Sequence, residues 1–217
     1  MTVELTENST HLPLPLLLAS AFFPLYNRCC NFISQISSVF IHILVQDLPV
    51  SMNTQGASPS SSPSSSSTRR WKYEVFLSFR GKDTRNSFTD HLYTALVQKG
   101  IFTFRDDEEL ERGEPISKEL PKAIAESRVA IVILSKRYAS STWCLDELAK
   151  ILKCKEEMGL IVLPVFHYVR PSDVRDQEGS FKKDFAKHEA DNTPQVKTWR
   201  DAFTEVASFS GWTLEEW

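Results

Sequence analysis

The residues of this chain that could do chemistry are a tryptophan, Trp143, and a carboxylate, Glu147, four positions apart. They follow an apolar run at residues 129–134 that predicts a buried strand, and the apolar spacing after Trp143 predicts an amphipathic helix. Glu147 is therefore expected near the start of a helix, beside the C-terminal end of a strand, where open α/β sheets bind ligands. An aromatic ring beside a carboxylate is suited to bind a sugar or a nucleobase. Taken alone, such a glutamate is more often a helix-surface charge, so its role depends on its neighbours.

Strand and helix signals alternate from Trp71 onward. Strands are expected at residues 73–79, 101–105, 129–135 and 160–166, with a fifth near 209–214 that is either short or missing. Helices are expected at 84–99, 117–127, 143–158, 180–189 and 195–209. This alternation implies right-handed crossovers and a parallel sheet covered on both faces. The sequence therefore predicts an α/β, flavodoxin-like fold of three layers, with four to five central strands in the order 2-1-3-4-5.

The predicted order brings the segments that follow the first and third strands to one crevice. The first strand runs into Arg80 and Gly81, and the third leads to Glu147. Arginine is shaped to fork onto phosphate oxygens, and glycine lets the backbone approach a ligand closely. We therefore expect Arg80, Gly81 and Glu147 to share a crevice that suits a phosphate-bearing ligand.

Several familiar kinds of site are absent from the sequence. It contains no G-x-x-x-x-G-K-[ST] loop, no G-x-G-x-x-G after a strand and no G-x-S-x-G elbow. The four cysteines form no C-x-x-C pair and no cluster with histidine at metal-ligand spacing, so neither a metal site nor a disulfide framework is expected. A reducing, intracellular setting is the simplest fit. The net charge of −3 gives no electrostatic reason to expect a nucleic-acid partner.

The first 70 residues differ in amino-acid composition from the rest of the chain. Residues 1–50 form an apolar but irregular leader that we expect to be disordered, and residues 51–70 form a Ser/Pro-rich linker with almost nothing to bury. Residues 12–48 lack the roughly 20 uninterrupted apolar residues of a membrane helix, so no stable membrane insertion is expected. One alternative is that residues 12–48 associate with a membrane or act as a targeting segment. Another is that translation of the protein starts at Met52.

Several segments follow the pattern of one family. They are YEVFLSFRGKDTR at residues 73–85, the charged segment at 104–116, YASSTWCLDEL at 138–148, LPVF at 163–166 and VRPSDVR at 169–175. With these segments, residues 71–212 resemble the TIR domain of plant intracellular immune receptors, and the segment at 104–116 looks like the family's BB loop. On this resemblance we assign residues 71–217 to a TIR domain, in a TIR-only or truncated chain.

The resemblance implies an NAD⁺ nucleosidase, of the glycohydrolase or ADP-ribosyl cyclase type, that releases nicotinamide and ADP-ribose-derived signals. It places the catalytic acid at Glu147, Ser141 and Trp143 along the pocket, and Arg80 and Gly81 near the substrate phosphates or ribose. NAD⁺ is the implied substrate, with no cofactor and no metal. The chemistry is plausible, because loss of nicotinamide leaves an oxocarbenium-like ribose that a carboxylate stabilises, and nicotinamide leaves without a general acid.

The resemblance also implies activity on self-association. The family usually carries a Ser-His pair on the helix after the first strand, where this chain has Asp90-His91. The implied partners are other TIR domains and TIR-type NLR receptors, in plant innate immune signalling in the cytoplasm and nucleus. Two other hypotheses stay open: a catalytically silent adaptor that acts by TIR–TIR binding, and a membrane-tethered scaffold that uses residues 12–48.

Overall fold

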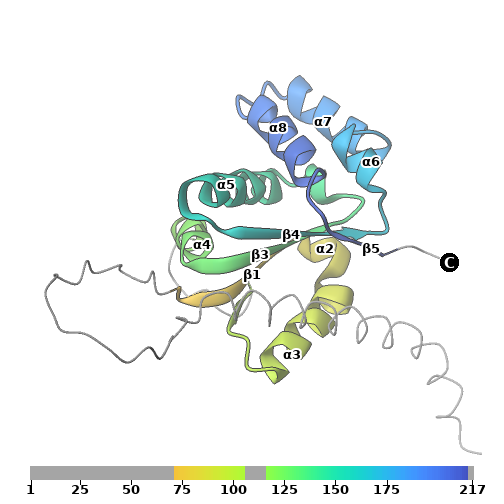
Figure 1. The fold of residues 1–217 in the computed structure, drawn as a ribbon. Coiled ribbons are helices and arrows are strands. Elements are labelled where there is room, and N and C mark those ends of the chain that lie inside the picture. The colour runs from red at the N-terminus through yellow and green to blue at the C-terminus, as the bar shows by residue number, and fades with distance from the viewer. Residues whose placement is uncertain (1–70, 106–115, 215–217) are drawn as a thin grey trace, which may run out of the picture. The chain divides into compact units, whose positions relative to one another are not determined.

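A computed structural model of the chain describes residues 71–105 and 116–214, which contain a five-stranded parallel sheet (Figure 1). The strand order is β2-β1-β3-β4-β5, so the predicted flavodoxin-like α/β fold and its order are confirmed. The strands are β1 Tyr73–Phe79, β2 Thr103–Phe104, β3 Ser127–Leu134, β4 Ile161–His167 and β5 Trp212–Leu214.

The pairing of β1 with β3 forms the centre of the sheet. Tyr73 lies opposite Ser127 and Phe79 opposite Ile133, so the two strands start and end together. β3 is buried along nearly its whole length. A strand covered on both faces needs apolar residues at successive positions, which accounts for the unbroken apolar run at residues 129–134. The C-terminal ends of β1 and β3 consequently deliver the segments after them to the same edge.

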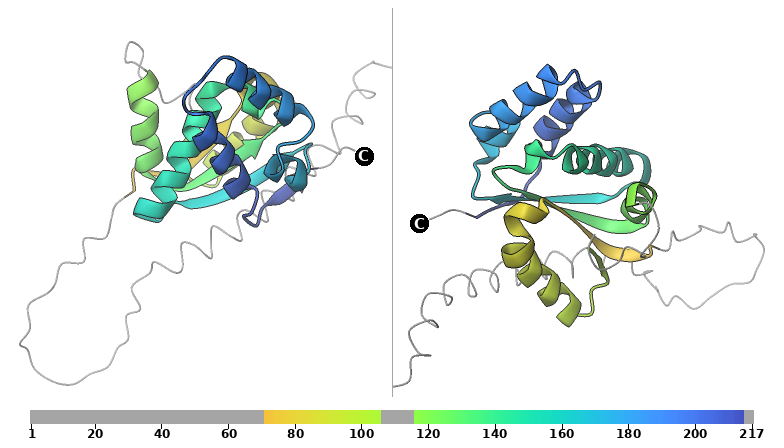
Figure 2. Two further views of the ribbon diagram at one scale, coloured as in Figure 1. Left: turned by 90° about the horizontal axis from the view of Figure 1, so that it is seen from above. Right: turned by 180° about the vertical axis from the view of Figure 1, so that it is seen from behind.

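Helices cover both faces of the sheet (Figures 1 and 2). α2 and α3 lie on one face, while α5, α7 and α8 lie on the other. The bounds are α2 Gly81–Thr84, α3 Asp90–Gln98, α4 Ile116–Ala125, α5 Thr142–Met158, α6 Pro171–Arg175, α7 Ser180–Ala190 and α8 Val196–Val206, with a π-helical turn at Arg85–Thr89 and a 3₁₀ turn at Tyr138–Ser140.

α5 is the helix that carries Trp143 and Glu147. Its apolar residues recur at the predicted helical spacing, and Leu145, Leu148 and Ile151 are fully buried against the sheet and the neighbouring helices. The face that bears these three residues fixes the rotation of α5 about its axis. That rotation in turn determines where the side chains of its first two turns lie.

The helix predicted at residues 84–99 is instead broken near its start. α2 begins earlier, at Gly81, and the backbone leaves helical geometry at Asn86 and Ser87 before α3 begins. The hydroxyl of Ser87 donates to the carbonyl of Thr84 at 3.3 Å, a local bond of the kind that competes with the helical ladder. The sequence interpretation also missed the short α6, and β2 is shorter than predicted.

We predict that Gly211→Ala destabilises the domain, because a methyl group at this position would overlap the carbonyl oxygen of Pro164 and lie 2.7 Å from its Cγ. Overpacking of this kind costs about 1–3 kcal/mol. Thermal unfolding of the 217-residue chain should show a melting temperature lowered by several degrees. Ser210→Ala, at the exposed neighbouring position, is the control and should leave it unchanged. Equal melting temperatures for the two variants would contradict the prediction.

Candidate active site

Glu147 lies in the second turn of α5 and is only 7% exposed. Its Oε2 accepts a 2.9 Å hydrogen bond from the Oγ of Ser78, a fully buried residue of β1. A buried carboxylate costs free energy unless polar groups replace the water that it loses, and Ser78 supplies such a group. Glu147 is therefore not the helix-surface charge that its position in the sequence alone would suggest.

Tyr138, in the 3₁₀ turn before α5, extends this buried polar chain. Its Oη lies 2.7 Å from the Oγ of Ser78 and 3.0 Å from the carbonyl oxygen of Cys144, to which it can donate. Burial raises the pKa of the Tyr138 phenol well above its ordinary value, and Cys144 and Glu147 shift it in the same direction. The phenol therefore keeps its proton at neutral pH, and the chain of oxygens joins β1, the 3₁₀ turn and α5.

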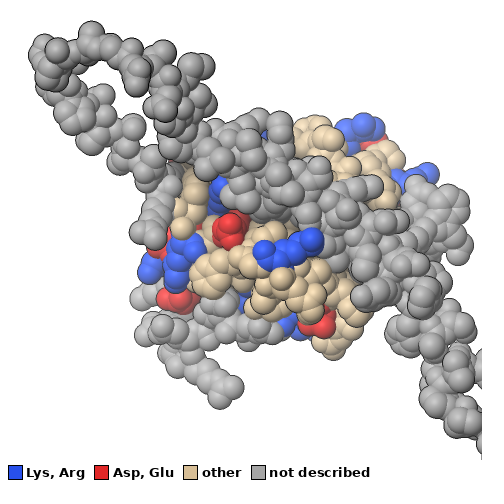
Figure 3. Space-filling model, turned by 60° about the horizontal axis from the view of Figure 1, so that its bottom comes forward, with Lys and Arg blue, Asp and Glu red and all other residues tan. Residues whose placement is uncertain are grey.

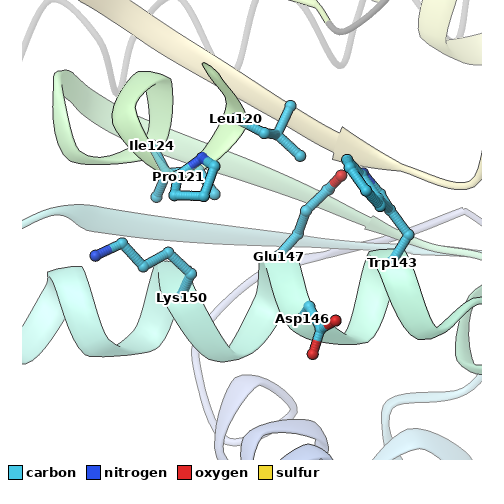
Figure 4. A pocket seen from close by; sticks show the side chains of 7 residues that line it. All are labelled: Leu120, Pro121, Ile124, Trp143, Asp146, Glu147 and Lys150. Carbon is cyan, nitrogen blue, oxygen red and sulfur yellow. The ribbon is translucent and has the colours of Figure 1, made fainter. Parts of the chain in front are cut away.

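A cavity of about 250 Å³ lies between α4 and α5, and Glu147 lines it (Figure 4). Trp143, one turn earlier on the same helix, is 40% exposed, and its ring lies beside the carboxylate of Glu147. The rest of the lining is apolar on the α4 side and charged farther along α5; it consists of Leu120, Pro121, Ile124, Asp146 and Lys150. The cavity thus offers an aromatic face, an apolar wall and a carboxylate within one small space.

Arg80, Gly81 and Ser141 line a separate cavity of about 540 Å³. The side chain of Arg80 is held there: its Nε donates to Ser140 at 3.0 Å, and it pairs with Asp83 at 3.5 Å. Two further cations, Lys82 and Arg85, border the same cavity. Three cations around an open cavity suit an anionic group such as a phosphate.

The predicted pocket residues therefore divide between two cavities rather than sharing one crevice. Glu147 and Trp143 line the first, and the other three predicted residues line the second. Ser141 also has a structural role, because its Oγ accepts from the backbone nitrogen of Cys144 at 3.3 Å and so caps α5. Ser141, the N-cap of α5, lines the second cavity, and Trp143, two positions later, lines the first. The segment at residues 106–115 lies outside the described residues.

Asp90 and His91, the predicted self-association residues, lie exposed on α3, on the face of the sheet opposite α5. The Oδ1 of Asp90 is 2.9 Å from the guanidinium of Arg105, a buried residue just after β2. That guanidinium also stacks over the ring of Tyr93 at 4.2 Å. Asp90 is therefore bound within its own domain, while His91 presents its side chain at the surface.

The sequence analysis did not identify Ser78, Tyr138 or Lys150 as residues of the site. The available signal for Ser78 was a hydroxyl within the apolar run that ends β1, because a buried polar group needs a partner. Its partner Glu147 is 69 positions away, so no local pattern connects the two. Lys150 lines the same cavity as Glu147, three positions further along α5, where helical spacing brings side chains to one face.

Residues 71–105 and 116–214, the part of the chain that the structure describes, contain neither a metal cluster nor a membrane-spanning helix. Within them, no group of three or more His, Cys, Asp or Glu side chains is placed to hold a metal ion. No helix of these ranges is long and apolar enough to cross a membrane, and the predictions for residues 1–70 fall outside them. Positive and negative side chains are interspersed in the view of Figure 3. The expected absence of metal and nucleic-acid partners stays a prediction.

Comparison with known proteins places this chain in a family. The TIR domain model matches residues 72–217. The chain is 54% identical over 155 residues to disease resistance protein RPV1 of Vitis rotundifolia, and 52% identical over 151 residues to TMV resistance protein N of Nicotiana glutinosa. These matches cover 71% and 68% of this chain but only 11% and 13% of the relatives, so the chain spans about a tenth of their length.

A solved structure agrees with these matches. The TIR domains in the activated Roq1 resistosome that directly recognises the pathogen effector XopQ are 57% identical to this chain, with a TM-score of 0.63. The match covers 65% of this chain and 87% of that one. With the parallel sheet in the order β2-β1-β3-β4-β5 and a family model that spans most of the chain, the chain belongs to the TIR domain family, in its form found in plant disease resistance proteins.

Proposed function

We propose that this chain is an NAD⁺ nucleosidase that cleaves the bond between nicotinamide and ribose. The observation that carries the proposal is the burial of Glu147 beside the half-exposed ring of Trp143 in one cavity. A glutamate that is 7% exposed is costly to keep unless it has a use there. A carboxylate in a water-poor cavity interacts more strongly with a developing positive charge than one at the surface.

The proposed reaction needs only one carboxylate. As the C1′–N bond breaks, its electron pair goes to the pyridinium nitrogen, so nicotinamide leaves neutral without a proton from the enzyme. The ribose is left as an oxocarbenium-like cation, which the negative charge of Glu147 stabilises. Water then adds at C1′, loses a proton to solvent and gives ADP-ribose; alternatively a hydroxyl of the same molecule, which also loses its proton, or a ring nitrogen adds and gives a cyclic product.

The remaining groups of the two cavities fit the rest of the substrate. The ring of Trp143 and the apolar wall of α4 suit a flat nicotinamide or adenine ring. The cations around Arg80 and Gly81 suit the diphosphate, and the absence of a side chain at Gly81 leaves room for the guanidinium of Arg85 against the backbone there. In this proposal Ser141 lies between the two sites and contributes through the capped first turn of α5.

We also propose that the chain acts in plant innate immune signalling by assembling with other TIR domains, including those of TIR-type NLR receptors, in the cytoplasm and nucleus. The kinship with disease resistance proteins and with the TIR domains of a resistosome supports this part of the proposal. The second candidate function is an adaptor that only binds other TIR domains. It is favoured by the exposed position of His91 on α3, away from both cavities.

Replacing the carboxylate tests the enzyme directly. Glu147→Gln keeps the shape of the side chain and removes its charge, so nicotinamide release from NAD⁺ should fall on the order of 10²- to 10³-fold. Circular dichroism should show an unchanged fold. Glu156→Gln, at an exposed position on the same helix, serves as the matched control and should keep full activity. Full activity in Glu147→Gln would favour the adaptor.

Trp143→Ala tests the aromatic wall of the cavity. Because the side chain is 40% exposed, its removal should cost little stability but should raise the KM for NAD⁺ several-fold. Phe102→Ala removes another exposed aromatic ring, 49% exposed and outside both cavities, and is the control for a general loss of apolar surface. A loss of melting temperature in Trp143→Ala with unchanged KM would show that the ring serves packing alone.

Dependence on assembly should appear in the concentration dependence of the rate. If activity requires association through α3, specific activity should rise with protein concentration, and His91→Ala should flatten that rise. Lys197→Ala, on α8 at the opposite face of the sheet, is the control and should retain the wild-type dependence. Specific activity that stays constant for the unmodified chain over a wide concentration range would count against assembly as a requirement.

A further inference from the structure

Ser78 is a buried hydroxyl near the C-terminal end of β1, one residue before the strand ends. It is fully buried, like its neighbours Leu77 and Phe79 in β1, yet it contacts two other polar groups. Its Oγ lies 2.9 Å from Oε2 of Glu147 and 2.7 Å from Oη of Tyr138. Burying a serine in a strand has no packing advantage over alanine, so these two contacts account for its presence.

We propose that Ser78 is the positioning residue for Glu147, and that Tyr138 orients Ser78 in turn. This inference deepens the proposed function and rests on it, since the carboxylate that is positioned is the proposed catalytic one. Fixing one of its two oxygens fixes the plane of the carboxylate relative to the ring of Trp143. A carboxylate held in this way needs no reorganisation when charge develops beside it.

The number of protons available to the hydrogen-bonded oxygens of Cys144, Tyr138, Ser78 and Glu147 limits how the hydroxyls can be oriented. The three close oxygen pairs run from the Cys144 carbonyl to Tyr138, from Tyr138 to Ser78, and from Ser78 to Glu147. A carbonyl and an ionised carboxylate can only accept, and each hydroxyl brings one proton. With Glu147 ionised, two protons serve three contacts, so the protons of Ser78 and Tyr138 must be shared out among them.

The negative charge determines that choice. A hydrogen bond to an ionised group is the stronger kind, so the Ser78 proton goes to Glu147. Tyr138 is then left to donate either to the Oγ of Ser78 or to the Cys144 carbonyl; donation to Ser78 polarises its hydroxyl further towards the carboxylate. The raised pKa of Tyr138 keeps the phenol proton available for this purpose. Because the Cys144 carbonyl can only accept, the single proton of Tyr138 is shared between that carbonyl and the Oγ of Ser78, and the share directed at Ser78 supports the contact that Ser78 makes with Glu147.

The first measurement is steady-state kinetics of nicotinamide release by the 217-residue chain. Ser78→Ala should lower kcat roughly 10- to 100-fold with KM changed less than about twofold, because the carboxylate is misoriented while the binding walls are intact. Tyr138→Phe should lower kcat by a smaller factor. Ser127→Ala is the matched control: it removes an equally buried strand hydroxyl, bonded at 2.7 Å to the Ala123 carbonyl, at the opposite end of the sheet, and should keep the wild-type kcat.

The second measurement does not depend on activity. In a double-mutant cycle, Ser78→Ala should lower the melting temperature by a few degrees in the unmodified chain and by clearly less in the Glu147→Ala background, because the shared hydrogen bond is already lost there. If the two substitutions are coupled in this cycle but the unmodified chain does not cleave NAD⁺, the proposed nucleosidase activity is wrong. The interaction between Ser78 and Glu147 is then still supported. Equal shifts in both backgrounds, or a wild-type kcat in Ser78→Ala, would overturn the positioning role.

Discussion

The parallel pairing of β1 with β3 is the constraint on which the rest of the domain depends. The two strands end together, with Phe79 opposite Ile133, so the chain leaves both at the same edge of the sheet. Arg80 and Gly81 follow β1 directly, and the 3₁₀ turn and α5 follow β3. A shift of this register by one residue would turn every side chain of β1 to the other face. Ser78 would then lie on the face away from α5, and Glu147 would lose that partner.

The sequence predicted well what depends on periodicity. The limits of β1, the strand order and α5 follow from apolar patterns that must match two buried sheet faces. It predicted less well where a single side chain overrides the pattern. At Asn86 and Ser87 the helix is interrupted beside a hydroxyl that bonds to the backbone, although the surrounding composition favours a continuous helix.

The sequence indicated which edge of the sheet carries the proposed site residues, but not how they are arranged there. Topology indicated correctly that Arg80 and Glu147 belong to segments at one edge of the sheet. It could not indicate that the first turn of α5 divides them between two cavities, because that depends on the rotation of the helix about its axis. The contacts of Glu147 with Ser78 and of Asp90 with Arg105 join residues 69 and 15 positions apart, where no repeat in the sequence reports on contact.

The shortness of the two outer strands limits how copies of such a domain can associate. β2 has two residues and β5 has three, and β5 pairs with β4 from Val165 onward, directly after Pro164, which has no N–H to offer. Edges this short present little backbone for another chain to extend as an added strand. Contacts between copies are thereby directed away from the open-ended stacking of sheets and towards helical surfaces. There, side chains rather than the backbone choose the partner.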